Sequence, residues 1–112
     1  MSEVAEVNNV ETSSTSYVDL VKHTCPSGKL ATRIDSFTIM PITSPEKALF
    51  RCEFNGDEKF NDFKIGVEVE YPFPLPYHDP WKVKPGQSLI LQIRSSDGTL
   101  VSALGKIMGK LF

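Results

Sequence analysis

The sequence lacks any apolar run long enough to cross a bilayer as a helix. Polar or charged residues interrupt every hydrophobic stretch well short of the roughly 20 residues that a membrane helix needs. The N-terminus, MSEVAEVNNVETSSTS, also lacks the basic start, the apolar run and the small-residue cleavage site of a secretory signal. We therefore expect no membrane partner and a chain made and folded in the cytoplasm.

Cysteine is scarce. Cys25 and Cys52 are the only two, which excludes a disulfide-based scaffold and is typical of buried thiols in a reducing compartment. The less favoured alternative is a single bridge, which would close a loop of about 27 residues and stabilise the fold by roughly 3 kcal/mol.

A basic cluster is also missing. The 12 Lys and Arg residues are spread along the chain, and the formal net charge is 12 − 14 = −2. Glu3, Glu6 and Glu11 give residues 1–16 a charge of −3, which leaves the rest of the chain at 12 − 11 = +1. Proteins that bind phosphate backbones gather positive charge on one surface, so we expect no nucleic acid partner.

Motifs for catalysis and for metal binding are absent as well. The serines lack a glycine elbow, and no glycine-rich loop links a strand to a helix. His23, Cys25 and Cys52, with His78-Asp79, could converge on zinc, but no C-x-x-C or H-x-x-x-H spacing supports such a site. We predict a protein that is not an enzyme and holds neither a metal nor a cofactor.

What the sequence does contain is two-residue alternation bounded by turn residues, which is typical of β-strands. Five segments show it or are rich in β-branched and aromatic residues: 17–25, 29–40, 48–55, 63–71 and 88–95. In the fourth segment, alternation predicts one face that carries Phe63, Ile65, Val67, Val69 and Tyr71. Asn55-Gly56-Asp57 and Ser96-Asp97-Gly98-Thr99 are turn sequences.

The last segment, LVSALGKIMGKLF, fits two periods. A helix would gather Leu100, Leu104, Ile107, Met108 and Leu111 on one stripe, but its two interior glycines would cost about 1 kcal/mol each. A strand would put the odd-numbered residues 101–111 on one face and both lysines on the other. We favour the strand.

Seven or eight short strands without a clear helix predict an all-β fold: a single antiparallel β-sandwich of jelly-roll type over residues 17–112. Residues 1–16 form a polar N-terminal arm, which we expect to be disordered in isolation because it has few apolar side chains. A neighbouring subunit is one candidate for holding it in place.

The stretch EYPFPLPYHDPW, residues 70–81, is rich in proline. Pro72, Pro74 and Pro76 remove the N–H donors from one edge of an extended chain, so this segment can pair on one side only. Four large side chains lie between or beyond these prolines: Phe73, Leu75, Tyr77 and Trp81.

Three interpretations of these four side chains stay open. They could close the mouth of the sandwich as a lid, which is the structural alternative. They could form an exposed patch that binds another protein chain, which is the functional hypothesis we carry forward. Tyr77 and Trp81 could instead stack on sugar rings.

Three stretches resemble small β-sandwich accessory proteins of tailed bacteriophage particles: CPSGKLATRIDSFTI, FRCEFNGDE and KPGQSLILQIRSSDGTLVSALGKIMG. The matching turn positions are Pro26, Gly28, Pro85, Gly86 and Gly98. The resemblance implies a capsid decoration protein or another virion component, which binds a particle surface as an oligomer, with a homotrimer as the expected form. The proline-rich stretch is not part of that pattern, and no site residue is carried over.

Our first functional hypothesis is therefore a non-enzymatic structural protein of the virion that binds a protein lattice and itself. The alternative is a carbohydrate-binding or receptor-binding module that uses Tyr71, Tyr77 and Trp81. A cellular adaptor or regulatory sandwich is a third class that the sequence leaves open.

Overall fold

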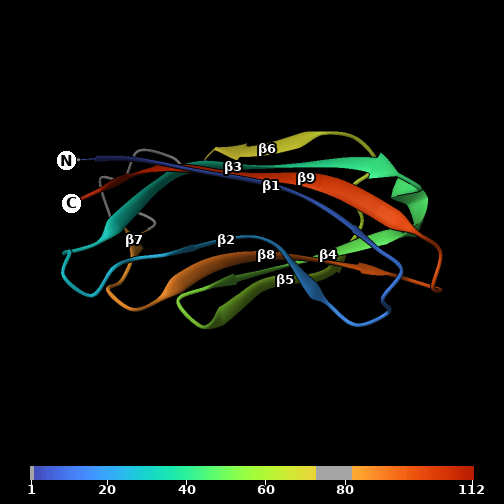
Figure 1. The fold of residues 1–112 in the computed structure, drawn as a ribbon, viewed down its shortest axis with the longest axis horizontal. Coiled ribbons are helices and arrows are strands. Elements are labelled where there is room, and N and C mark those ends of the chain that lie inside the picture. The colour runs from blue at the N-terminus through green and yellow to red at the C-terminus, as the bar shows by residue number, and fades with distance from the viewer. Residues whose placement is uncertain (1, 73–81) are drawn as a thin grey trace.

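The computed structural model describes residues 2–72 and 82–112, and there it forms nine strands in two antiparallel sheets that stack face to face (Figure 1). The strands are β1 Ser2–Thr12, β2 Val18–Thr24, β3 Thr32–Thr43, β4 Ala48–Phe54, β5 Asp57–Phe63, β6 Val69–Pro72, β7 Lys82–Val83, β8 Ser88–Ser95 and β9 Val101–Leu111. A short 3-10 helix, Pro45–Lys47, precedes β4. Among the described residues no helix has the length and hydropathy to cross a membrane.

The strand order is that of a jelly roll. Sheet A has the order β1-β9-β3-β6, with β7 pairing on β3, and sheet B has the order β2-β8-β4-β5. The pairs are nested, because β1 pairs with β9, β2 with β8, β3 with β6 and β4 with β5, all antiparallel. Eight strands in these four pairs form two Greek keys. The predicted fold class is confirmed, and the two-residue β7 is additional to the eight.

The core lies between the two sheets. Alternation along β8 buries Leu89, Leu91 and Ile93 completely and leaves Ile90 and Gln92 half-buried on the outer face, as the sequence predicts. The largest fully buried side chains are Phe50, Leu20, Ile39, Leu89, Leu91, Ile93 and Ile107. Burying each such group stabilises the fold by about 1.5 to 3 kcal/mol relative to leaving it exposed.

The C-terminal segment is a strand, so the favoured prediction is confirmed. Its inward face carries Gly105, where an added Cβ would lie 2.7 Å from Cγ1 of Val21 on the opposite sheet. At Gly109 an added Cβ would collide with the backbone carbonyl of Arg33. The two glycines that weaken a helix here allow β9 to approach β2 and β3 closely.

The prediction of one strand over residues 63–71 is wrong. The chain turns at Asn55 and Gly56, which both have positive φ angles (52° and 84°), and returns as β5 in sheet B. It then leaves β5 at Phe63 and enters sheet A at Val69, so Ile65 is buried while Val67 is 73% exposed. Alternation does not reveal a crossover between sheets.

The expectation of disorder for residues 1–16 is wrong for Ser2–Thr12. This segment is β1, which pairs with β9 from Ser2↔Leu111 to Thr12↔Val101 without a register shift. Val4 and Val10 point toward the core, and the amide of Asn8 donates to the carbonyl of Leu20 at 2.9 Å. A partner strand from the other end of the chain therefore supplies the order that local composition does not.

Candidate functional site: two outer faces and one free edge

The predicted partner-binding residues, Phe73, Leu75, Tyr77 and Trp81, lie outside the described residues. The strands that flank this stretch are described. β6 and β7 both pair with β3, through Ser36↔Pro72 and Thr32↔Val83. The described residues before and after this stretch therefore lie on the same side of β3.

The histidine and cysteines considered for zinc serve the core instead. His23 is buried, and its Nε2 lies 2.8 Å from Oγ1 of Thr32, while its Nδ1 lies 3.7 Å from a carboxylate oxygen of Glu6. Cys25 and Cys52 are buried free thiols, as the sequence predicts. Burial raises the pKa of Cys52 to about 12, so this thiol is protonated at neutral pH and is a poor nucleophile.

Within residues 2–72 and 82–112 no three His, Cys, Asp or Glu side chains are grouped so that they could hold a metal ion. His78-Asp79, the remaining part of the zinc hypothesis, lies outside that part of the chain. The described residues therefore offer no candidate metal centre.

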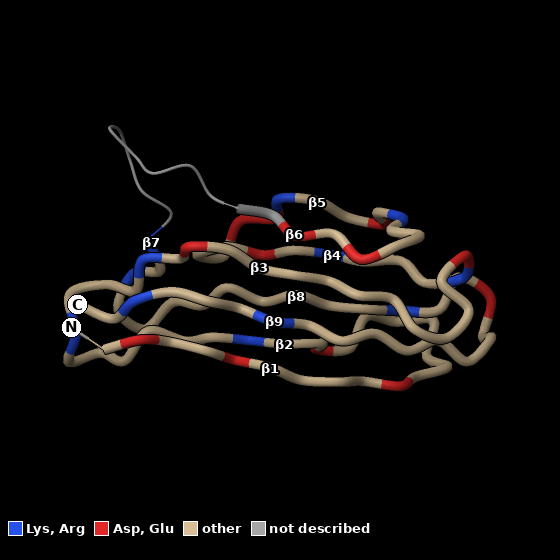
Figure 2. Tube along the Cα trace, turned by 90° about the horizontal axis from the view of Figure 1, so that it is seen from above, with Lys and Arg blue, Asp and Glu red and all other residues tan. Residues whose placement is uncertain are grey.

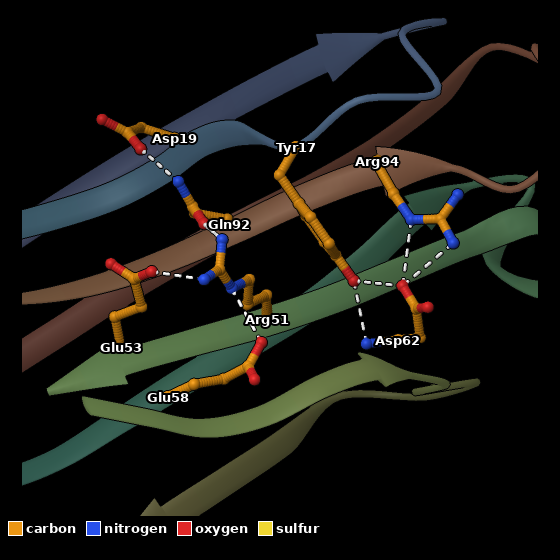
Figure 3. Close-up of polar contacts among 8 residues, drawn as sticks. All are labelled: Tyr17, Asp19, Arg51, Glu53, Glu58, Asp62, Gln92 and Arg94. Carbon is orange, nitrogen blue, oxygen red and sulfur yellow. Dashed lines mark hydrogen bonds and ion pairs between the residues drawn. The ribbon is translucent and has the colours of Figure 1, made fainter. Parts of the chain in front are cut away.

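The outer face of sheet B is polar, and its charges pair with one another (Figure 3). Arg51 on β4 lies 2.5 Å from the carboxylate of Glu53 and donates from Nε to Glu58 on β5 at 3.0 Å. Its Nη1 also donates to Oε1 of Gln92 at 3.4 Å, and the amide of Gln92 donates to Asp19 on β2 at 2.9 Å. This network crosses all four strands of the sheet.

A second group on this face joins Tyr17, Asp62 and Arg94 (Figure 3). The Tyr17 hydroxyl donates to Oδ1 of Asp62 at 2.6 Å and accepts the backbone N–H of Asp62 at 2.8 Å. Arg94 donates from Nε to the same Oδ1 at 3.0 Å. Asp62 sits in a β-bulge of β5 with φ of 50°, and the bulge aims its carboxylate at the other two groups.

Within this trio each ionisable side chain is paired with another member. Hydrogen bonds from Tyr17 and Arg94 lower the pKa of Asp62, while partial burial and the Asp62 carboxylate raise the pKa of Tyr17. The guanidinium carbons of Arg94 and Arg51 lie 5.5 and 5.9 Å from the centre of the Tyr17 ring, within cation–π range. These groups tie the start of β2 and the bulge of β5 to the sheet, and their charges are matched without a ligand.

The outer face of sheet A has a different character. Ile39, Ala103 and Ile107 are fully buried, so their neighbours along β3 and β9 point outward. Registers place Leu104 between Asn9 and Met40, and Met108 opposite Ala5. We define the apolar face as these five exposed or half-buried side chains: Ala5, Val7, Met40, Leu104 and Met108.

Charged residues flank the apolar face. At one end a cross-strand row joins Glu3, Lys110 and Arg33, and at the other end Glu11 lies opposite Ser102. Lys106 stands in the middle of the face, beside Val7, where its aliphatic stem can cover apolar surface. The result is apolar surface on both sides of Lys106, with further charged residues at both ends, on a sheet face that is usually polar when it meets only water.

The four lateral edges of the sheets are not equally protected. The edge strand β2 has a bulge at Asp19 and Val21 and carries Lys22, and β5 has two register shifts and several charges. β6 is four residues long and ends at Pro72. β1 is eleven residues long and has no bulge, no proline and no lysine.

No family model matches the chain, and no curated protein matches it, so the argument for function has to come from these surfaces. Sequence reasoning missed the apolar face, because Lys106 and Lys110 made the outward side of the last strand look polar. Leu104 and Met108, which alternate with these lysines, were the signal. Val7 was hidden in a segment expected to be disordered.

Proposed function

We propose that this protein is a non-enzymatic structural component that assembles with itself and with a protein lattice, as a capsid decoration protein or another virion component does. The observation that carries the proposal is the apolar face on the outside of sheet A. The outer face of sheet B differs, because charged side chains there pair with one another.

The apolar face has the anatomy of a protein interface. Its apolar side chains include two methionines and surround the stem of Lys106, and charged residues lie at both ends, as apolar residues and charges are arranged in the core and rim of known interfaces. Val7 is 58% exposed, so docking against a second surface would remove much of its side chain from water. A four-stranded sheet is also rigid, so little conformational entropy is lost on docking.

The virion part of the proposal draws on the jelly-roll order and on the resemblance through Pro26, Gly28, Pro85, Gly86 and Gly98. Jelly rolls occur in viral capsids and also in lectins and cupins, so the fold alone does not choose among them. The alternative carbohydrate-binding function depends on Tyr77 and Trp81, outside the described residues, whereas the apolar face is described in full. The apolar face supports assembly, whereas the virion and homotrimer parts of the proposal rest on the resemblance alone.

Light scattering on two matched variants tests the proposal. Leu104→Glu with Met108→Glu puts two negative charges into the apolar face, whereas Ile90→Glu puts one negative charge at a half-buried position on the outer face of sheet B. We expect the wild-type chain and Ile90→Glu to form the same oligomer, and the double variant to run at the 12.5 kDa of one chain. Equal circular dichroism spectra would show that all three are folded.

A wild-type chain that stays at 12.5 kDa at every concentration and binds no particle would contradict the proposal. So would a double variant that assembles as the wild type does, because the apolar face would then not be the contact.

A further inference from the structure

Among residues 2–72 and 82–112 no strand pairs with β1 on the side away from β9, and the register shows which backbone groups β1 presents on this free edge. The N–H and C=O of Phe112 both bond toward the β3 side, to Ala31 and Leu30. Successive residues of a strand direct these groups to alternate sides, so Leu111 faces β1 and pairs with Ser2. Even-numbered residues of β1 therefore bond to β9, and five residues present their N–H and C=O to the free edge: Glu3, Ala5, Val7, Asn9 and Glu11.

This edge lacks the usual protection against strand addition. Edge strands are normally blunted by proline, lysine, a bulge or short length, and the edges at β2, β5 and β6 show such features. Figure 2 shows β1 along one long side of the molecule, with acidic positions along it and no basic one. A ladder of eleven residues is thus open to one more strand.

Charge decides which strand fits. β1 carries Glu3, Glu6 and Glu11 and no positive residue. A second copy of β1 would bring two strands of charge −3 together, and of the three carboxylates on each only that of Glu3 lies opposite a cation, Lys110 on β9, so net repulsion opposes pairing. Glu3 and Glu11 share the outer face and are eight residues apart, about 26 Å along a strand.

We propose that the β1 edge binds an extended basic segment of another protein, which adds as a fifth strand to the β1-β9-β3-β6 order. The best segment has two Lys or Arg residues eight positions apart, opposite Glu3 and Glu11, with apolar side chains between them that continue the apolar face past Val7. This inference rests on the proposed function, because it names a partner for an assembly protein. It concerns the edge of β1 and not the apolar face.

Peptide binding to the full chain tests it. The probe is the peptide KTVTVTVTK with a fluorescent label, which pairs antiparallel with β1 so that the N–H groups of its Lys and Val residues face the edge. Its controls are ETVTVTVTE, of opposite charge, and KTPTPTPTK, which has the same charge but lacks three of these N–H donors. We expect anisotropy to show binding of the first peptide only, and binding to weaken with added salt. Binding should slow amide hydrogen exchange at Ala5, Val7 and Asn9, whose N–H groups face the edge.

Two variants of the chain sharpen the test. Asn9→Pro removes one outward N–H and leaves the bonds from β1 to β9 intact, because a proline is tolerated where the N–H faces solvent. It should weaken binding at least tenfold, while Asn9→Thr should bind as the wild type does. Glu3→Gln with Glu11→Gln should weaken binding roughly three- to thirtyfold, from two opposite-charge pairs across strands.

Three outcomes would overturn the inference. In the first, the peptide KTVTVTVTK does not bind although the chain still assembles, which contradicts the edge proposal and leaves the proposed function intact. KTPTPTPTK binds equally well, so the attraction is charge alone. Asn9→Pro dissolves an oligomer that Leu104→Glu with Met108→Glu leaves intact, so the occupant of the edge is a second copy. Peptide binding without any assembly would instead support the edge and contradict the proposed function.

Discussion

Replacing Gly105 with alanine should destabilise the protein, because β9 lies close to β2 of the other sheet at this glycine. The added Cβ would lie 2.7 Å from Cγ1 of Val21 and 2.8 Å from Cγ of Leu20, both buried on β2. Forcing an extra carbon into a packed core costs about 1 to 3 kcal/mol, and the lower entropy of unfolded alanine offsets about 0.4 to 1 kcal/mol of that. The net loss is then about 0 to 2.6 kcal/mol, and at the midpoint of about 1.3 kcal/mol the Tm falls by about 5 to 10 °C.

Urea denaturation followed by circular dichroism measures this change, with Gly66→Ala as the matched control. Gly66 lies in the crossover between β5 and β6, and an added Cβ there meets no atom within 4 Å. Gly66→Ala should therefore be as stable as the wild type or slightly more stable. If Gly105→Ala were equally well tolerated, the sheets could not be as close at β9 and β2 as the structure has them.

Two further predictions concern titration and thiol chemistry. Hydrogen bonds from Thr99 and the ion pair with Lys47 lower the pKa of Asp97 from 3.8 to about 2, so this carboxylate stabilises the fold above about pH 4 and loses that effect as the pH falls through about 2. Asp97→Asn should therefore flatten the acid-unfolding curve between these two pH values. A curve as steep as that of the wild type would count against the contact between Asp97 and Lys47. Cys25 and Cys52 are buried, so Ellman's reagent at pH 8 should react with neither thiol in the folded protein and with both in denaturant. Rapid reaction of the folded protein would show that the core is open to the reagent.

The sequence predicts strands well where one face is buried along the whole element. β8 follows the rule, because Leu89, Leu91 and Ile93 alternate with outward residues of which only Ile90 is apolar, and its ends are marked by turn residues. β9 is the harder case, since its pattern fits a helix too. The argument from the cost of Gly105 and Gly109 in a helix decides correctly, and the structure adds a reason for both: close approach between strands.

The failures come from contacts between distant parts of the chain. β1 has only Val4 and Val10 as inward apolar groups, and its order depends on a ladder to a strand about 100 residues away, which local composition cannot reveal. β5 is missed because its sequence, DEKFNDF, is mostly charged and polar, as an exposed edge strand can be. Its partner in the sheet, not its own side chains, makes it a strand.

The candidate surfaces were predictable only in part. The polar groups of sheet B are visible in the sequence as outward residues of alternating strands, but the bulge that brings Asp62 to Tyr17 and Arg94 is not. The apolar face combines residues from β1, β3 and β9, so the jelly-roll order is needed to see it. The proline-rich stretch, which the sequence singles out most clearly, lies outside the described residues.

The most direct test of assembly through the apolar face is the rate at which its methionines are oxidised. Met40 and Met108 are half-buried on that face, so dilute peroxide should convert both to the sulfoxide, and mass spectrometry of peptides reports each rate. We expect both rates to fall together as the protein concentration rises and the chains associate. Rates that do not change with concentration, in a chain that light scattering shows to be associated, would mean that the apolar face stays open to water and that the contact lies elsewhere.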